Sequence, residues 1–188
     1  MSTTTPTRER PDTRRRGPLP VIVVVIAAAL LFAAFALDGP GAAGGDTSAL
    51  PNPMGGQALP APGTASESAT LGGLQVDGRL VEMGAVGLGV TYVPGWEVVN
   101  PTGEDVVVTV GQPQVLEGCC PGPVYADGTL IEPGDEVIVP AGGGTLVQFP
   151  LQMHPGMDGW HDLAVPLQAG GEQAALQVTG DFTADASA

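Results

Sequence analysis

The chain has 188 residues, which is room for one domain of ordinary size with additional segments. Lysine is absent, and from Asp38 onward eighteen acidic residues stand against Arg79 alone, a formal net charge of −17. An acidic surface of this kind excludes binding to the phosphates of nucleic acid and favours cations or basic partners.

The N-terminal residues predict a membrane anchor. Residues 1–18 are polar and contain the other five arginines, so we expect a disordered cytoplasmic tail. Residues 19–37 are apolar apart from one proline and would rise roughly 28 Å as a helix, close to the thickness of a bilayer core. The preceding arginines keep the N-terminus in the cytoplasm and place the rest of the chain outside. A cleaved signal peptide is the alternative, because Ala34-Phe35-Ala36 has the form of a cleavage site.

The next segment, residues 38–73, contains fourteen glycines and prolines in thirty-six residues and no aromatic residue. Such a composition cannot bury a core. We therefore expect a flexible stalk that holds the following domain away from the membrane.

The remaining chain changes to short β-rich runs separated by turn signals such as Pro133-Gly134. About seven strands in roughly 110 residues, without helical periodicity, predict an all-β, Ig-like antiparallel β-sandwich over residues 74–184. We expect Trp96, Phe149 and Trp160 to contribute to its core. The predicted strands are 79–83, 90–100, 105–116, 136–139, 145–153, 160–167 and 173–179.

Three loop motifs in order carry a resemblance to a known family. They are Val99-Asn100-Pro101-Thr102-Gly103-Glu104-Asp105, Gly118-Cys119-Cys120-Pro121 and Ile131-Glu132-Pro133-Gly134. Over about residues 79–168 the chain resembles a bacterial Ig-like family related to the major sperm protein and ciliary Ig-like domains. That family has Cys-Gly-Cys or a similar motif where this chain has Cys-Cys. The resemblance implies an Ig-like fold and a membrane-anchored or secreted location, and it brings no established activity.

One short segment concentrates the residues that could bind a metal. Both histidines, His154 and His161, lie within residues 153–161 together with Met153 and Met157. The segment carries turn signals between two predicted strands, so we expect it to be the tip of a β-hairpin. Alternation along the strands places Met153 and His161 on the same inward face and turns His154 away from it.

The only two cysteines of the chain, Cys119 and Cys120, are adjacent. Thiolate, thioether and imidazole groups favour copper(I) or zinc. The predicted ligands are Cys119, Cys120, Met153 and His161, with Met157 and His154 in reserve. Copper(I) suits the sulfur-rich set, and zinc suits two cysteines with two histidines. Each residue also has a structural alternative: core packing for Met153, a buried hydrogen-bonded role for His161, and a vicinal disulfide for the cysteines.

Enzymatic chemistry has little support in the sequence. Serine is scarce in the domain, neither histidine lies in a recognisable nucleophile motif, and no glycine-rich loop opens a helix to bind a nucleotide. We expect a single-pass extracytoplasmic binding protein, not an enzyme, that stores a soft metal or delivers it to another envelope protein. The alternatives are an Ig-like interaction or structural module without metal and a thiol redox sensor.

Overall fold

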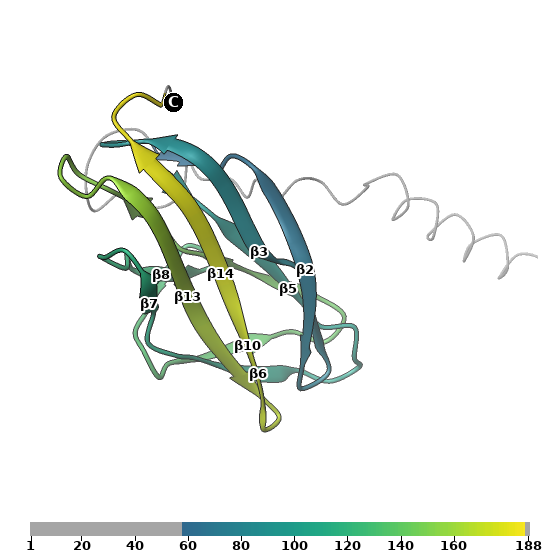
Figure 1. Cartoon of the computed structure of the whole chain (residues 1–188). Helices are drawn as coiled ribbons and strands as arrows, with labels where there is room; N and C mark the ends of the chain where they lie inside the picture. The colour runs from purple at the N-terminus through teal and green to yellow at the C-terminus, as the bar shows by residue number, and fades with distance from the viewer. Residues whose placement is uncertain (1–57, 187–188) are drawn as a thin grey trace, which may run out of the picture. The chain divides into compact units, whose positions relative to one another are not determined.

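The computed structural model describes residues 58–186, and this part of the chain is all-β (Figure 1). The predicted tail, the predicted membrane span and residues 38–57 of the predicted stalk lie outside the described residues. No helix among residues 58–186 is long and apolar enough to cross a membrane. The strands are β1 (Ala58–Pro60), β2 (Thr64–Leu71), β3 (Leu74–Gly87), β4 (Thr91–Val93), β5 (Gly95–Val99), β6 (Val106–Val110), β7 (Gln114–Glu117), β8 (Val124–Ala126), β9 (Thr129–Ile131), β10 (Glu136–Val139), β11 (Gly144–Gln148), β12 (Leu151–Gln152), β13 (Gly159–Ala169) and β14 (Glu172–Thr183).

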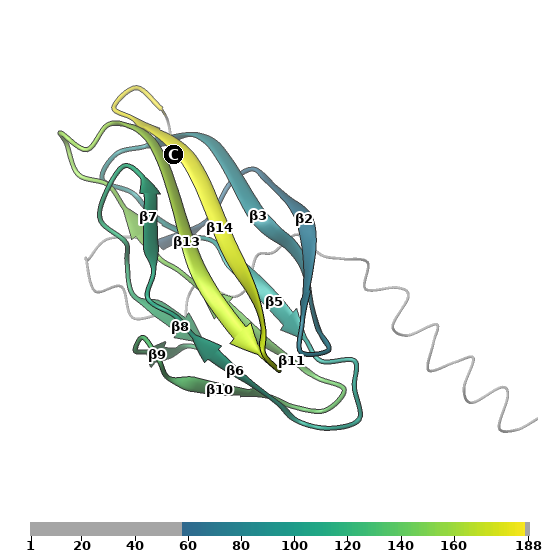
Figure 2. The same cartoon turned by 60° about the horizontal axis from the view of Figure 1, so that its bottom comes forward.

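Four long strands form one layer of the domain. β2, β3, β14 and β13 lie side by side in that order, and Figure 1 shows β5 passing behind them. Two short pairings, the start of β3 with β5 and the end of β13 with β6, connect this layer to the strands behind it. Figure 2 shows β7 beside β13, with β6, β8, β9 and β10 at the near end. The sheets thereby enclose one core, as in a sandwich.

The strand pairing differs from the prediction in number and direction. Among the described residues, twelve strands, β3 to β14, replace the seven expected after residue 73, and β1 and β2 precede them. Two pairs, β14 with β3 and β1 with β4, are parallel where only antiparallel pairs were predicted. Proline accounts for part of the difference in number, because it cannot donate a hydrogen bond within a strand. Pro94 separates β4 from β5, and Pro150 lies between β11 and β12. These breaks face each other, since the Phe149 amide donates to the Pro94 carbonyl at 3.1 Å.

The folded region begins earlier than the sequence predicted. Residues 58–73 were assigned to the stalk, but β1 and β2 form within them. β2 pairs with β3 along most of its length, and Leu71 at its end is fully buried. This segment is poor in large apolar residues because β2 is an edge strand with most of its side chains in solvent. The composition of residues 58–73 therefore does not distinguish them from residues 38–57 of the predicted stalk.

The core follows the alternation of the strands. In β13 the odd-numbered residues from His161 onward point inward, so Trp160 points outward and is 46% exposed, contrary to the prediction. Trp96 and Phe149 are buried as expected. The largest fully buried side chains are Trp96, Phe149, Phe182, Leu71, Leu74, Leu151, Met153, Leu163, Leu167, Leu176, Val76 and Val86.

Candidate functional site

The pairing of β7 with β13 brings the cysteine loop to a histidine. Glu117, the last residue of β7, lies opposite Asp162 of β13. Because the two strands are antiparallel, the next residue of one, Gly118, lies beside the preceding residue of the other, His161. The contact is close enough that a Cβ atom on Gly118 would lie 2.4 Å from the His161 Cδ2 atom. Gly118 also has a φ of 86°, a conformation that suits glycine.

Hydrogen bonds and packing fix the orientation of the His161 ring. Its Nδ1 atom lies 3.0 Å from the Gly159 carbonyl oxygen, and a carbonyl can only accept, so the Nδ1 atom carries the proton. The ring packs edge-on against Phe182, with 5.2 Å between the ring centroids. Only 4% of the residue is exposed. The Nε2 atom is therefore left to face Cys119.

The Cys119 thiol is the hydrogen-bond partner of the His161 Nε2 atom. The Cys119 Sγ atom lies 3.7 Å from the His161 Nε2 atom, where the thiol donates to the ring nitrogen. Cys119 is half-buried, and Cys120 is exposed with a φ of 58°. A hydrogen bond with the Cys120 side chain, then burial and the charge interaction with Cys120, raise the pKa of the Cys119 thiol. Both cysteines are free thiols in the structure.

The segment predicted as a hairpin tip is instead a connection between two sheets. β12 pairs with β4, and β13 pairs with β14, β6 and β7, so β12 and β13 do not form a hairpin. The predicted turn at Pro155-Gly156 does occur. The Met157 amide donates to the His154 carbonyl at 3.0 Å, and Gly156 has a φ of 93°, as in a type II turn.

This connection places its three predicted ligands in different surroundings. Met153 is fully buried in the hydrophobic core, as its structural alternative predicted. Met157 is half-buried and packs against the same core, whereas His154 is exposed. Within residues 58–186 no group of three or more histidine, cysteine, aspartate or glutamate side chains is close enough to hold a metal ion. In the structure Cys119 therefore contacts His161, Cys120 follows Cys119 in the chain, and His154 does not belong to the group.

The distance between the two joined donors can be compared with metal geometry. Bonds of about 2.3 Å to sulfur and about 2.0–2.1 Å to nitrogen place two ligands of one ion about 3.5 Å apart at a tetrahedral angle and about 3.8 Å apart at a trigonal angle. The observed 3.7 Å lies between these values. The hydrogen bond from Nδ1 to a carbonyl is also the usual outer contact of a metal-binding histidine. The pair can therefore bind a soft ion without a large rearrangement.

Three residues that support the site were not identified from the sequence: Gly118, Gly159 and Phe182. Gly118 precedes the cysteines, and glycine before a functional residue is a signal of close backbone approach. The carbonyl of Gly159 and the ring of Phe182 act through the register of β13 and β14, in which Gly159 lies opposite Phe182. No sequence pattern reports that register, so these two residues required the structure.

No family model matches the chain, and no curated protein matches it. Among solved structures it is similar to the ASH / PapD-like domain 7 of human CEP192, at 15% identity over 60% of this chain and 87% of that chain, with a TM-score of 0.39. It is also similar to WR4, a C. elegans MSP family member, at 10% identity over 59% and 98%, with a TM-score of 0.34. A family 123 glycoside hydrolase from Clostridium perfringens matches at 5% identity over 55% of this chain and 23% of that chain, with a TM-score of 0.41.

The similar structures thus include PapD-like and MSP domains, whereas the bacterial family that the loop motifs resemble stays a prediction. The all-β architecture is established by the strand pairing of this chain itself.

Proposed function

We propose that this chain is a membrane-anchored extracytoplasmic protein that binds copper(I) through Cys119, Cys120 and His161. The observation that supports the proposal is the 3.7 Å contact between the Cys119 Sγ and His161 Nε2 atoms, with the histidine already held in the metal-binding tautomer. Cys120, adjacent and exposed, is the third donor. Its side chain would complete a trigonal site.

Copper(I) fits these donors better than zinc. Two thiolates and one imidazole form a soft set, and copper(I) accepts a low coordination number. Structural zinc requires four ligands, and His154, the second histidine, does not join the group. Zinc is therefore the second choice. It would require a water molecule or a residue from elsewhere as the fourth ligand.

The donors also differ in exposure, and this favours delivery over storage. His161 is buried, Cys119 is half-buried and Cys120 is exposed. An ion held by these residues is fixed from the interior side and open on the Cys120 side. A ligand of another envelope protein can approach it there and displace the donors one at a time. We therefore propose that the chain passes its ion to such a partner and has no enzymatic activity.

Metal analysis of the full chain, purified without oxygen in detergent or nanodiscs, tests the proposal. We expect stoichiometric copper(I), which is lost in the Cys119→Ser/Cys120→Ser double variant and strongly reduced in His161→Gln. His154→Gln is the matched control, because that histidine is exposed and outside the site, and it should bind copper as the wild type does. Wild-type protein that binds no copper under reducing, anaerobic conditions would refute the proposal.

A second function is favoured by the adjacency of two free thiols. Because Cys119 and Cys120 follow each other in the chain, the pair can be joined as a vicinal disulfide. Exchange with a disulfide of an extracytoplasmic oxidant would form that bond, and the oxidant would be reduced to two thiols. Counting free thiols in protein isolated without reductant separates the two functions. A redox pair gives two reactive thiols when it is reduced and none when it is oxidised, and neither result depends on metal. A copper site instead gives two thiols that react only after a chelator removes the ion.

A further inference from the structure

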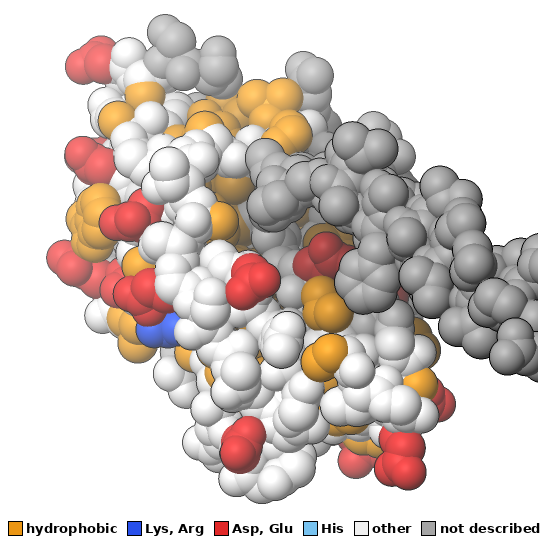
Figure 3. Space-filling model, turned by 90° about the vertical axis from the view of Figure 1, so that its right-hand side faces the viewer, with side chains coloured by type: hydrophobic (Ala, Val, Ile, Leu, Met, Phe, Trp, Pro, Cys, Tyr) orange, Lys and Arg blue, Asp and Glu red, His pale blue; other side chains and the backbone are white. Residues whose placement is uncertain are grey.

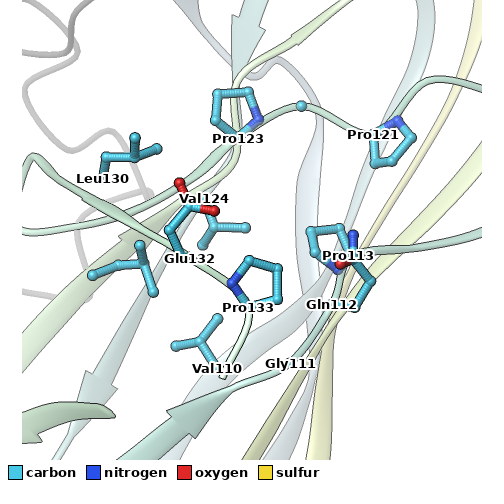
Figure 4. A pocket seen from close by; sticks show the side chains of 12 residues that line it. Val110, Gly111, Gln112, Pro113, Pro121, Pro123, Val124, Leu130, Glu132 and Pro133 are labelled. Atoms are coloured by element: carbon cyan, nitrogen blue, oxygen red, sulfur yellow. The ribbon is translucent and has the colours of Figure 1, made fainter. Parts of the chain in front are cut away.

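A second feature of the domain is a hollow next to the cysteine loop, with a volume of about 290 Å³ (Figure 4). It lies between the segment that joins β6 to β7, the loop that follows the cysteines and the turn between β9 and β10. Figure 4 shows proline rings on several sides of it. Its lining residues are Val110, Gly111, Gln112, Pro113, Pro121, Gly122, Pro123, Val124, Leu130, Ile131, Glu132 and Pro133.

The walls of the hollow are fixed before any ligand arrives. The Gly134 amide donates to the Val110 carbonyl at 2.8 Å, and the Val110 amide donates to the Asp135 carbonyl at 3.0 Å, so the turn is held to the end of β6. On the other side Gly122 packs so closely on Pro150 that a Cβ atom would lie 2.0 Å from its carbonyl oxygen. A preformed site of this kind loses little conformational entropy on binding.

The hollow is lined by apolar side chains, by polar backbone groups and by a single acidic side chain. Its prolines, valines, leucine and isoleucine offer apolar surface, and the Leu130 side chain is 51% exposed at its edge. Glu132 is the only charged residue among the lining side chains. Within residues 58–186 the only lysine or arginine is Arg79, and it pairs with Glu67. No arginine or lysine of the described domain therefore neutralises Glu132.

The size of the hollow and the charge of the domain indicate the occupant. About 290 Å³ is at the lower limit of small-molecule pockets, which span about 300–1,000 Å³, and it suits an inserted side chain. Acidic groups are also spread over the domain surface, as the face in Figure 3 illustrates. We propose that the hollow docks a basic segment of a partner protein, with one apolar side chain inserted between the prolines and a neighbouring lysine or arginine paired with Glu132.

This docking site is independent of the metal proposal, although the two are adjacent. Pro121 lines the hollow and directly follows Cys120. A segment seated in the hollow would thus lie beside the exposed thiol. The geometry requires no metal for docking, so each proposal can fail without the other.

Fluorescence anisotropy with the full chain in nanodiscs and labelled peptides of equal length tests the docking site. The probes are an alternating lysine–valine peptide, an alternating lysine–serine peptide and an alternating glutamate–valine peptide. We expect the lysine–valine peptide to bind at least about tenfold more tightly than the other two, since only it supplies both charge and an apolar side chain. Equal binding of the two lysine peptides would show attraction to the acidic surface alone and would overturn the proposal.

Two pairs of variants locate the binding. Leu130→Ser should weaken binding of the lysine–valine peptide by about tenfold, whereas Ile138→Ser, which changes a side chain 61% exposed on β10 outside the hollow, should leave it unchanged. Glu132→Gln should weaken it by several-fold, and Glu136→Gln on β10 should not. All four residues are exposed, so the fold should tolerate each change. Equal losses within either pair would place the binding elsewhere and refute the docking site.

Discussion

Residues 118–123 and residues 153–158 both connect strands and both carry soft metal donors, but the fold uses them differently. The first segment leaves β7, which is paired with β13, and this register brings Cys119 into contact with His161. The second leaves β12, which belongs to a different sheet from β13. Its donors are divided between the core and the solvent, with Met153 fully buried and His154 exposed.

The difference shows that strand pairing decides which donors meet, and that closeness in sequence does not. Met157 and His161 are four residues apart, yet the residue in contact with the His161 ring nitrogen is Cys119, forty-two residues away. A pair joined across two hydrogen-bonded strands has a fixed geometry, because each strand holds its own donor. A donor on an exposed turn has no such support. Changes in residues 153–158 should therefore mainly lower stability, whereas changes in residues 118–123 should mainly lower copper binding.

The largest effect on stability should come from Met153→Ala in the second segment. Removing a fully buried methionine side chain loses its burial and leaves a cavity, which should lower the free energy of unfolding by about 2–5 kcal/mol. Copper affinity of the remaining folded protein should not change. Met157→Ala is the control and should cost about 1 kcal/mol, since that side chain is half-buried. Denaturant titration and copper competition measure the two quantities. Loss of copper affinity in folded Met153→Ala would make Met153 a ligand.

A smaller loss of stability, with a large loss of copper binding, should follow Gly118→Ala. The new methyl group would lie 2.4 Å from the His161 Cδ2 atom, and the buried ring cannot move aside freely. We expect a loss of about 2–3 kcal/mol from backbone strain and overpacking together. Gly156→Ala is the matched control in the other segment, because it has a similar φ of 93° and nothing within 4 Å of its added Cβ. It should cost about 1 kcal/mol and leave copper binding intact.

If both glycine variants reduce copper affinity equally, the packing of Gly118 on His161 has no special role. In that case the loss would reflect general destabilisation. The histidine ring resonances in the NMR spectrum of each variant provide an independent measurement. Those of His161 should shift in Gly118→Ala only.

The sequence predicted well which side chains of a strand are buried, because inward and outward residues alternate along it. The burial of His161, Met153, Trp96 and Phe149 follows from period-two strands and composition. What the sequence could not supply is the identity of each strand's neighbour, because many registers satisfy the same alternation. Asp127-Gly128 illustrates the limit. This dipeptide is itself a turn signal, and both residues have positive φ as in a type I′ hairpin, but β8 and β9 on either side are too short to be detected from the sequence.

The smallest expected effect is a pH dependence that distinguishes the two cysteines of the first segment. The contact with Cys120 and burial raise the pKa of the Cys119 thiol, so Cys119 is protonated at neutral pH and copper(I) must displace its proton. Above about pH 7 the apparent copper affinity should therefore increase about tenfold per pH unit for each thiol proton released, and it should level off once the pH exceeds the raised pKa. Competition with a copper(I) chelator across this range measures the slope.

The Cys120→Ser variant tests the cause of the raised pKa of Cys119. Because the interaction with Cys120 is the main cause, this variant should lower the pH at which iodoacetamide alkylates Cys119 half-maximally. An unchanged midpoint would mean that the Cys120 side chain does not raise the pKa of Cys119.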